Sequence, residues 1–307
     1  MSEDRGYTFV DYCTQGYLGL VGAILLVGQG RANRSWPLLL AGHVAAMGLI
    51  HALIRLQMRR PDIRLLTFLR HYYPVLLYAP FYCETGALNH VLIPGFLDSQ
   101  FVHLEARLFG LQPSLALMNW LPYPAVSEVL YAAYFSYYAM IGGVGFALFL
   151  RNREQLFHYL SVISFVFYAC YLTYIFVPVI GPRIFFRAIS GYTLPAGLQP
   201  AVAPDFPAAV QAGPFYGIMA WIYQRFEAPG AAFPSSHVAI AIATVYFSFL
   251  YLRPIRWWHF AAMILLCIAT VYCRYHYVVD VAGGVLAAAV LIPLGDWLYQ
   301  MSRSYRR

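Results

Sequence analysis

The residues of this sequence that can do chemistry lie in three short stretches, of which CRYHYVVDVAGG is the most informative. It places His276 four residues before Asp280. Residues four apart on a helix share a face, so the carboxylate can hold one imidazole nitrogen and fix the tautomer of the ring. The other nitrogen is then free to attack phosphorus, and Asp280 stabilises the positive charge that develops. We predict that His276 is a nucleophile oriented by Asp280.

The other two stretches are VPVIGPR, which ends at Arg183, and AAFPSSHVA, which holds Ser235, Ser236 and His237. Arginine binds phosphoryl oxygens bidentately without losing its proton, so Arg183 and Arg274 are predicted phosphate ligands. The serines begin an apolar run, where hydroxyls and free backbone N–H groups at a helix start favour an anion. His237 is predicted to protonate a leaving alkoxide.

Each of these residues also has a purely structural interpretation. A histidine or arginine at the end of a membrane span can serve as an interfacial anchor, and a serine at a helix start can be a plain cap. Asp280 is the hardest to explain structurally, because a carboxylate inside an apolar run is costly unless it is paired. Gly283 and Gly284 are expected to let this helix pack closely against a neighbour.

The elements that must position these residues are membrane spans. Of the 307 residues, 61% are hydrophobic and only 11% are charged, which is typical of a protein that resides in a bilayer. A span needs about 20 apolar residues. We predict eight spans, at 9–28, 36–54, 65–83, 124–150, 155–180, 236–251, 257–273 and 276–299. The expected fold class is an all-α integral membrane protein with about eight transmembrane helices.

We expect one membrane domain with an N-terminal extension. Residues 1–85 would form about three extra spans, 86–123 a loop or interfacial helix, and 124–307 the catalytic core. Segment 184–235 would be an extracytoplasmic loop. All 20 basic residues are arginines, and they are more frequent in the segments that an inside N-terminus places in the cytoplasm. We therefore predict a multi-pass protein of the cell inner membrane with an outward-facing active site.

Some polar and aromatic residues have no assigned role in the site. In LDSQFVHLEARLFGLQPS, four apolar residues share one helical face, which indicates an interfacial helix or a loop helix packed on its own protein: Leu97, Phe101, Leu104 and Leu108. Arg70 and Glu84 are interpreted as parts of a buried polar network, with head-group contact as the alternative. The tyrosines of one span are expected at helix contacts and interfaces: Tyr131, Tyr134, Tyr137 and Tyr138.

The sequence resembles the type 2 phosphatidic acid phosphatase superfamily. FPSSH at 233–237 and His276-x-x-x-Asp280 match the second and third motifs of that superfamily. The resemblance implies phosphate contacts for Ser235 and Ser236, a general acid at His237 and a nucleophile at His276. It covers about residues 98–290, and the three motifs are individually weak but jointly fairly specific.

Two departures from the phosphatase pattern concern the basic residues. The arginine expected six residues before the nucleophile is Thr270, and Arg274 stands only two residues before His276. The lysine of the first motif is Phe176, in a chain without any lysine, and Arg187 and Arg225 are candidate replacements. Gly-Pro-Arg, Arg-x-His-x-x-x-Asp and the upstream LFGLQPS are more similar to the inositolphosphotransferase-like branch, which includes inositol phosphorylceramide synthase.

The predicted activity is therefore phosphate transfer or hydrolysis on lipids through a phosphohistidine, with head-group transfer between lipids favoured. Segment 184–235 is long enough to cover the site and exclude water, as transfer requires. The alternative is a plain phosphatase for phosphatidate, phosphatidylglycerophosphate or a polyprenyl diphosphate. The sequence leaves open which acceptor, water or a lipid hydroxyl, takes the phosphate.

The expected partners are the bilayer and a phospholipid or other lipid-phosphate substrate, with no nucleic acid, no cofactor and no metal. The oligomeric state is left open. Rival interpretations are a haem protein that uses His43 and His51, a zinc site made by His237, His276 and Asp280, and a transporter that has lost the chemistry. The five cysteines show no metal-ligand spacing and are expected to be packing residues.

Overall fold

The computed structural model describes residues 6–29, 35–188, 206–226 and 228–304, and within these ranges the chain is helical with no strand. The long helices are α1 (Phe9–Val27), α2 (Trp36–Arg59), α3 (Arg64–Leu88), α6 (Pro124–Arg151), α7 (Arg153–Phe176), α11 (Ser236–Tyr251), α12 (Arg256–Tyr272) and α13 (Val278–Ser304). The short helices are α4 (Asp98–Phe109), α5 (Pro113–Trp120), α8 (Pro182–Ala188), α9 (Ala208–Gln211) and α10 (Pro214–Phe226).

Each predicted span coincides with one long helix, and the protein is an all-α, multi-pass integral membrane protein. The helices α1, α2, α6, α7 and α13 are long and apolar enough to cross a bilayer, and α11 and α12 are apolar but shorter. Helix α3 is 25 residues long and carries Arg70 and Glu84 in its interior.

Several helix boundaries differ from the sequence prediction. Helices α2, α3 and α13 each end five residues beyond the predicted span, at Arg59, Leu88 and Ser304. Two further differences involve the motif segments. The span predicted over 155–180 ends as a helix at Phe176, because Pro178 disfavours helical backbone at the residue before it. The span predicted over 276–299 begins as a helix only at Val278. Residues 273–277 form a tight connection instead, in which Arg274 adopts a left-handed φ of 61°.

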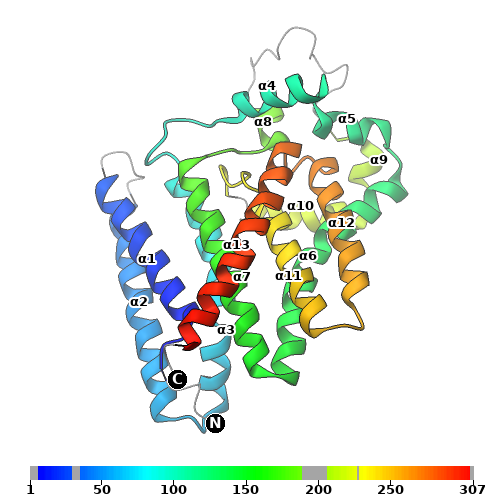
Figure 1. The fold of residues 1–307 in the computed structure, drawn as a ribbon. Coiled ribbons are helices and arrows are strands. Elements are labelled where there is room, and N and C mark those ends of the chain that lie inside the picture. Colours follow the sequence, from blue (N-terminus) through cyan, green and yellow to red (C-terminus); the bar gives the residue numbers. More distant parts are fainter. Residues whose placement is uncertain (1–5, 30–34, 189–205, 227, 305–307) are drawn as a thin grey trace.

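Both ends of the described chain lie at one end of the helix bundle, and α4 and α8 lie at the other (Figure 1). Helices α4 and α8, which lie in the two long segments between spans, are thus at the same end of the molecule. The third motif stretch lies where α12 ends and α13 begins, close to α4 and α8 in the same view.

Helix α7 is the central element of the bundle and packs against α1, α3, α6, α11 and α13. Most of its residues are buried, including Tyr159, Ile163 and Tyr174. Polar contacts fasten the N-terminal helices to one another. Glu84 of α3 lies 2.7 Å from Nε2 of His43 of α2, and Nδ1 of the same ring lies 3.0 Å from the Leu18 carbonyl oxygen of α1. This finding supports the buried-network interpretation of Glu84.

Candidate active site

Backbone contacts bring the first two motif segments together. Val179 forms a parallel bridge with Ala231, in which the Val179 N–H donates to the Gly230 oxygen at 3.3 Å and the Ala232 N–H donates to the Val179 oxygen at 2.8 Å. The third segment approaches at Gly181, which has a φ of +84° and whose absent Cβ would lie 2.6 Å from the Tyr275 carbonyl oxygen. A glycine is required there both by the backbone angle and by the lack of space.

The second and third segments also meet through backbone. The Ser235 N–H donates to the Asp280 carbonyl oxygen at 3.0 Å. A Cβ on Gly284 would lie 2.5 Å from the Ser235 oxygen, and one on Gly283 would lie 2.5 Å from the Phe233 ring. The close packing predicted for these two glycines is therefore confirmed, and the N-terminal turns of α11 and α13 are in contact.

His276 and Asp280 do not share a helix face as the sequence suggested, because His276 precedes the first residue of α13. The backbone N–H of His276 donates to the Thr270 oxygen at 3.0 Å, which folds the connection back on α12. Nδ1 of His276 nevertheless lies 3.4 Å from Oδ2 of Asp280. That oxygen accepts a 2.8 Å hydrogen bond from the Tyr277 N–H, so the carboxylate also caps its own helix.

The nucleophile candidate is buried and electrically neutral. Only 4% of His276 is exposed. Burial lowers the pKa of His276 to about 4, while a backbone hydrogen bond with Ala232 acts in the opposite direction. At neutral pH the ring is therefore an uncharged imidazole, which is the form that can attack an electrophile.

His237 lies beside His276, with ring centroids 5.7 Å apart and planes inclined by 59°. Its Nε2 is 3.0 Å from the hydroxyl of Tyr134 on α6, and that hydroxyl is also hydrogen-bonded to the hydroxyl of Tyr223 on α10. Its Nδ1 is buried and has no hydrogen-bond partner in the described part of the chain. The tyrosine pair thus engages one nitrogen of His237 and leaves the other available.

The two predicted phosphate arginines have different surroundings. The guanidinium carbon of Arg183 lies 4.6 Å from the ring centre of Tyr223 and 5.5 Å from that of Tyr275, and the two rings stack 4.2 Å apart. Arg183 is thus placed beside Tyr223, which bonds the tyrosine that contacts His237, and beside Tyr275, the residue before His276. Arg274 is 1% exposed and lies 5.1 Å from the ring centre of Phe206.

The two serines also differ. Oγ of Ser235 accepts from the Val238 N–H at 3.4 Å, so this hydroxyl is the N-cap of α11. The backbone N–H of Ser236 donates to the Tyr174 hydroxyl at 3.3 Å, and Ser236 lines a cavity. Of the two hydroxyls, only that of Ser235 is used as a helix cap.

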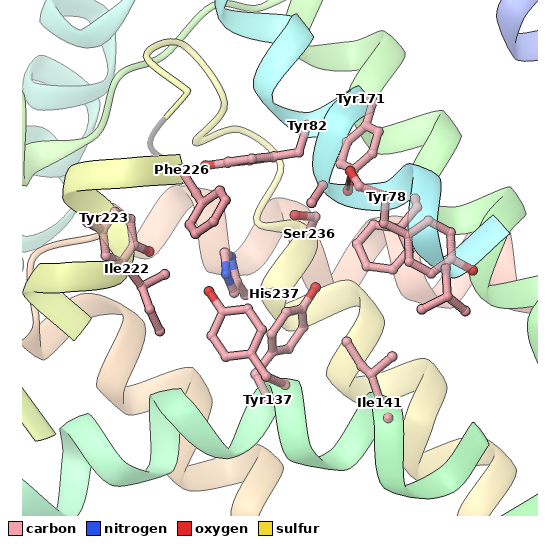
Figure 2. A pocket seen from close by; sticks show the side chains of 15 residues that line it. Tyr78, Tyr82, Tyr137, Ile141, Tyr171, Ile222, Tyr223, Phe226, Ser236 and His237 are labelled. Carbon is pink, nitrogen blue, oxygen red and sulfur yellow. Dashed lines mark hydrogen bonds between the residues drawn. The ribbon is translucent and has the colours of Figure 1, made fainter. Parts of the chain in front are cut away.

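A cavity of about 460 Å³ opens beside His237 and Ser236 (Figure 2). Its walls come from α3, α6, α7 and α10 and are mainly aromatic. The tyrosines that line it are Tyr78, Tyr82, Tyr137, Tyr138, Tyr171 and Tyr223. The exposed lining is mostly apolar, and helix α3 of the N-terminal extension forms part of one wall.

A family model described as the PAP2 superfamily matches residues 99–294. The chain belongs to the PAP2 superfamily. The match runs from α4 into α13 and includes all seven predicted site residues. Comparisons with curated proteins and with solved structures gave no match. Membership supports a phosphatase-type membrane enzyme that acts on a lipid phosphate.

This PAP2 protein contains site residues that the sequence analysis missed. Tyr134 and Tyr137 flank His237 with ring centroids at 4.9 and 4.6 Å, and Tyr223 joins them from α10. Asp98 and Glu105 of α4 are completely buried beside the motif segments. A signal was present, because Asp98, Val102 and Glu105 share one helix face. The neighbouring face, which carries Leu97, Phe101, Leu104 and Leu108, gives the stronger hydropathy signal and masks the acidic one.

The remaining candidate ligands of the PAP2 protein show no contact with the histidine pair, or their side chains are not described. Arg225 is exposed and stacks on Trp221 at 4.4 Å, and the side chain of Arg187 is not among the described residues. His51 hydrogen-bonds Tyr7. Across the described ranges, no group of three His, Cys, Asp or Glu side chains is arranged to hold a metal ion.

Proposed function

We propose that this PAP2 protein moves a phosphate-bearing head group from a phospholipid donor to a lipid hydroxyl through a phosphohistidine at His276. The observation that carries the proposal is the pair of histidine rings, 5.7 Å apart. One ring faces a buried carboxylate, and the other lines a mainly aromatic cavity of about 460 Å³. We place the enzyme in the inositolphosphotransferase-like branch, with a phosphoinositol-type lipid as donor and a sphingoid lipid such as ceramide as acceptor.

In the first step, Nε2 of His276 attacks phosphorus, and the bond between phosphorus and the diacylglycerol oxygen breaks. With the anionic donor bound, the phosphate charge favours a proton on both nitrogens of His237, so that Nε2 donates to Tyr134 and Nδ1 gives its proton to that leaving oxygen. The 3.4 Å separation between Nδ1 of His276 and Asp280 shortens as positive charge develops on the nucleophile. Arg183 and Arg274 neutralise the equatorial phosphoryl oxygens, and Ser236 adds a hydroxyl contact.

In the second step, the acceptor hydroxyl replaces the leaving alcohol. Its oxygen attacks phosphorus, the N–P bond breaks, and the hydroxyl proton returns to Nδ1 of His237. Both histidines then regain their starting protonation states. With water as acceptor the same steps give hydrolysis, so the acceptor alone separates a transferase from a phosphatase.

Two features support transfer over hydrolysis. Helix α10 lies over the acid histidine through the bond from Tyr223 to Tyr134, which limits the access of water to His237. The cavity beside His237 is lined mainly by aromatic rings and suits a hydrocarbon chain better than bulk water. We further propose that the site faces the extracytoplasmic side of the inner membrane and that residues 1–85 form an extension that completes the cavity through α3.

The test is to incubate the purified protein with radiolabelled phosphatidylinositol, with and without ceramide or diacylglycerol, and to identify the products. We expect labelled head group on the acceptor lipid and inhibition by vanadate, which mimics pentavalent phosphorus. Release of water-soluble phosphate from phosphatidate alone would instead favour a phosphatase. Turnover that is unchanged in His276→Ala would refute the phosphohistidine, and no turnover of any lipid phosphate would favour a non-catalytic transporter.

A further inference from the structure

Helix α4 lies at the same end of the bundle as α8, above it in Figure 1. Two of its acidic side chains are buried. Asp98 and Glu105 are both 0% exposed. Val102, between them on the same face, is buried in a small apolar cluster with Val179, Phe185 and Tyr277. The helix therefore rests on residues of the first and third motif segments.

Asp98 holds the first motif segment through its backbone. Its two carboxylate oxygens accept from the Ile180 N–H at 2.9 Å and from the Gly181 N–H at 3.0 Å, directly before α8 and Arg183. The Leu97 N–H also donates to the Pro178 oxygen at 2.9 Å. The Tyr277 hydroxyl donates to the same carboxylate at 3.0 Å, so Asp98 also reaches the third segment.

Glu105 holds the start of α13. Its Oε1 accepts from the Val278 N–H at 2.5 Å and from the Val279 N–H at 3.3 Å. These groups belong to the first turn of α13, where backbone N–H groups have no partner within the helix and the dipole favours a negative charge. Glu105 therefore caps the helix that carries Asp280, from a segment more than 170 positions earlier in the chain.

We infer that Asp98 and Glu105 are positioning residues, which hold the segments of Arg183 and of His276 and Asp280 in register by accepting backbone N–H bonds. They touch neither of the two histidine rings in any bond described above. Their role is to fix where α8 and α13 begin. The kinetic test of this inference rests on the proposed phosphotransfer, whereas the structural test, by hydrogen–deuterium exchange, does not.

The outer face of α4 is consistent with this arrangement. Leu104 and Leu108 are 42% and 61% exposed, so they cannot supply the packing that holds α4 in place. Of the leucine face predicted from the sequence, Phe101 packs on Phe233 and Tyr277. The carboxylates and Val102 therefore form the side of α4 that attaches it to the site.

The structural test is hydrogen–deuterium exchange of the full-length protein in detergent, which reports directly on the amide groups concerned. Glu105→Ala is expected to increase exchange in peptides covering 276–284, and Asp98→Ala in peptides covering 177–183. Arg107→Ala, an exposed position on the same helix, is the matched control and should change neither. Unchanged exchange in both carboxylate variants would overturn the inference, whatever the substrate proves to be.

The kinetic test uses two Glu105 variants, one that shortens the side chain and one that removes its charge. Glu105→Asp keeps the charge but withdraws the carboxylate by one methylene, so we expect kcat to fall by about 100-fold with little change in KM. Glu105→Gln keeps an acceptor oxygen in place and should lose only a few-fold. An Asp variant as active as the wild type, or a Gln variant as impaired as the Asp variant, would contradict positioning by Glu105. Failure of the wild type to turn over phosphatidylinositol would instead contradict the proposed function.

Discussion

Two buried carboxylates, one in the N-terminal helices and one at the site, are satisfied to very different degrees. Asp11 of α1 accepts from Arg70 at Oδ1 at 2.9 Å and again at Oδ2, from the Tyr73 hydroxyl at 2.6 Å and from the Thr8 hydroxyl at 2.7 Å. Asp280 accepts one backbone bond at Oδ2, and its Oδ1 has no hydrogen-bond partner among the described residues. Both residues are 0% exposed.

The comparison separates a carboxylate that stabilises the fold from one that, under the proposed mechanism, supports the chemistry. Buried polar atoms are nearly always hydrogen-bonded, so a buried atom without a partner needs a specific explanation. Near the site such atoms cluster, because Nδ1 of His237, Nδ1 of His276, Oδ1 of Asp280 and Oε2 of Glu105 all lack a partner within the described chain. Substrate and developing charge can provide the missing interactions.

The largest expected effects come from one substitution in each of the two regions, His276→Ala at the site and Asp11→Asn in the N-terminal helices. His276→Ala should lower kcat by at least about 10⁴-fold and leave the melting temperature nearly unchanged, because the ring is a neutral group without a satisfied network. Asp11→Asn should cost about 3–5 kcal/mol of stability, because it leaves Arg70 buried without its countercharge, and should leave kcat unchanged. Thermal melts and single-turnover assays on both variants measure this. Similar stability losses in both would remove the distinction.

A smaller effect is expected from the hydroxyl that engages His237. Tyr134→Phe should lower kcat by about 10–100-fold, because the ring loses the group that fixes its orientation and proton position. Tyr223→Phe should cost less, since it touches His237 only through Tyr134. Tyr123→Phe, an exposed position at the start of α6, is the control. Wild-type kcat in Tyr134→Phe would show that His237 is positioned by packing alone.

The smallest effect concerns pH. Burial raises the pKa of Glu105 to about 7, and the negative charge of Asp280 on α13 adds to this shift. Because protonation is easier in the folded state, Glu105 costs no stability below about pH 4.5, and the cost grows as pH rises through 7. Glu105→Gln should therefore raise the melting temperature at pH 8 but not at pH 4.5.

The same substitution should affect activity in the opposite direction. Charge-assisted bonds to the α13 amides are stronger than neutral ones, so wild-type kcat should fall a few-fold as pH falls through 7. The kcat of Glu105→Gln should not fall as pH falls through 7, and it should equal that of the wild type at low pH. The remaining acid limb should lie near 4, where His276 becomes protonated. A wild-type profile that is flat between pH 8 and 5 would contradict this role of the charge.

Much of the fold was predictable because a bilayer makes hydropathy a strong signal. Eight apolar runs each became a helix. Helices α2, α3 and α13 extend five residues past the predicted ends, whereas near the site local backbone chemistry ends α7 early and delays the start of α13. Pro178 and the left-handed Arg274 are such places. The expectation that His276 and Asp280 share a helix face was wrong for this reason, although the two side chains still approach each other. The division at residue 85 stays a prediction.

The site was predictable only where residue types repeat a known spacing. The histidines, Asp280 and the close glycines follow from local motifs, whereas Asp98, Glu105 and Tyr223 act on segments far away in the sequence. Glu105 bonds Val278, 173 positions later. No periodicity links Asp98 and Glu105 to their segments, because most of their partners are backbone amides, which nearly every sequence position provides. Their only local signal is an acidic pair on a helix face that also carries buried valine.

The contact of Gly284 with the Ser235 carbonyl determines which parts of α11 and α13 can change in sequence without moving the site. It leaves no room for a methyl group, so backbone, not side chains, sets the spacing between the start of α11 and the start of α13. The separation of the two histidines is then insulated from changes on the lipid-facing surfaces of both helices. Those surfaces, which include Val285 and Leu286, are free to adapt to membranes of different thickness or lipid composition while the reacting groups keep their geometry.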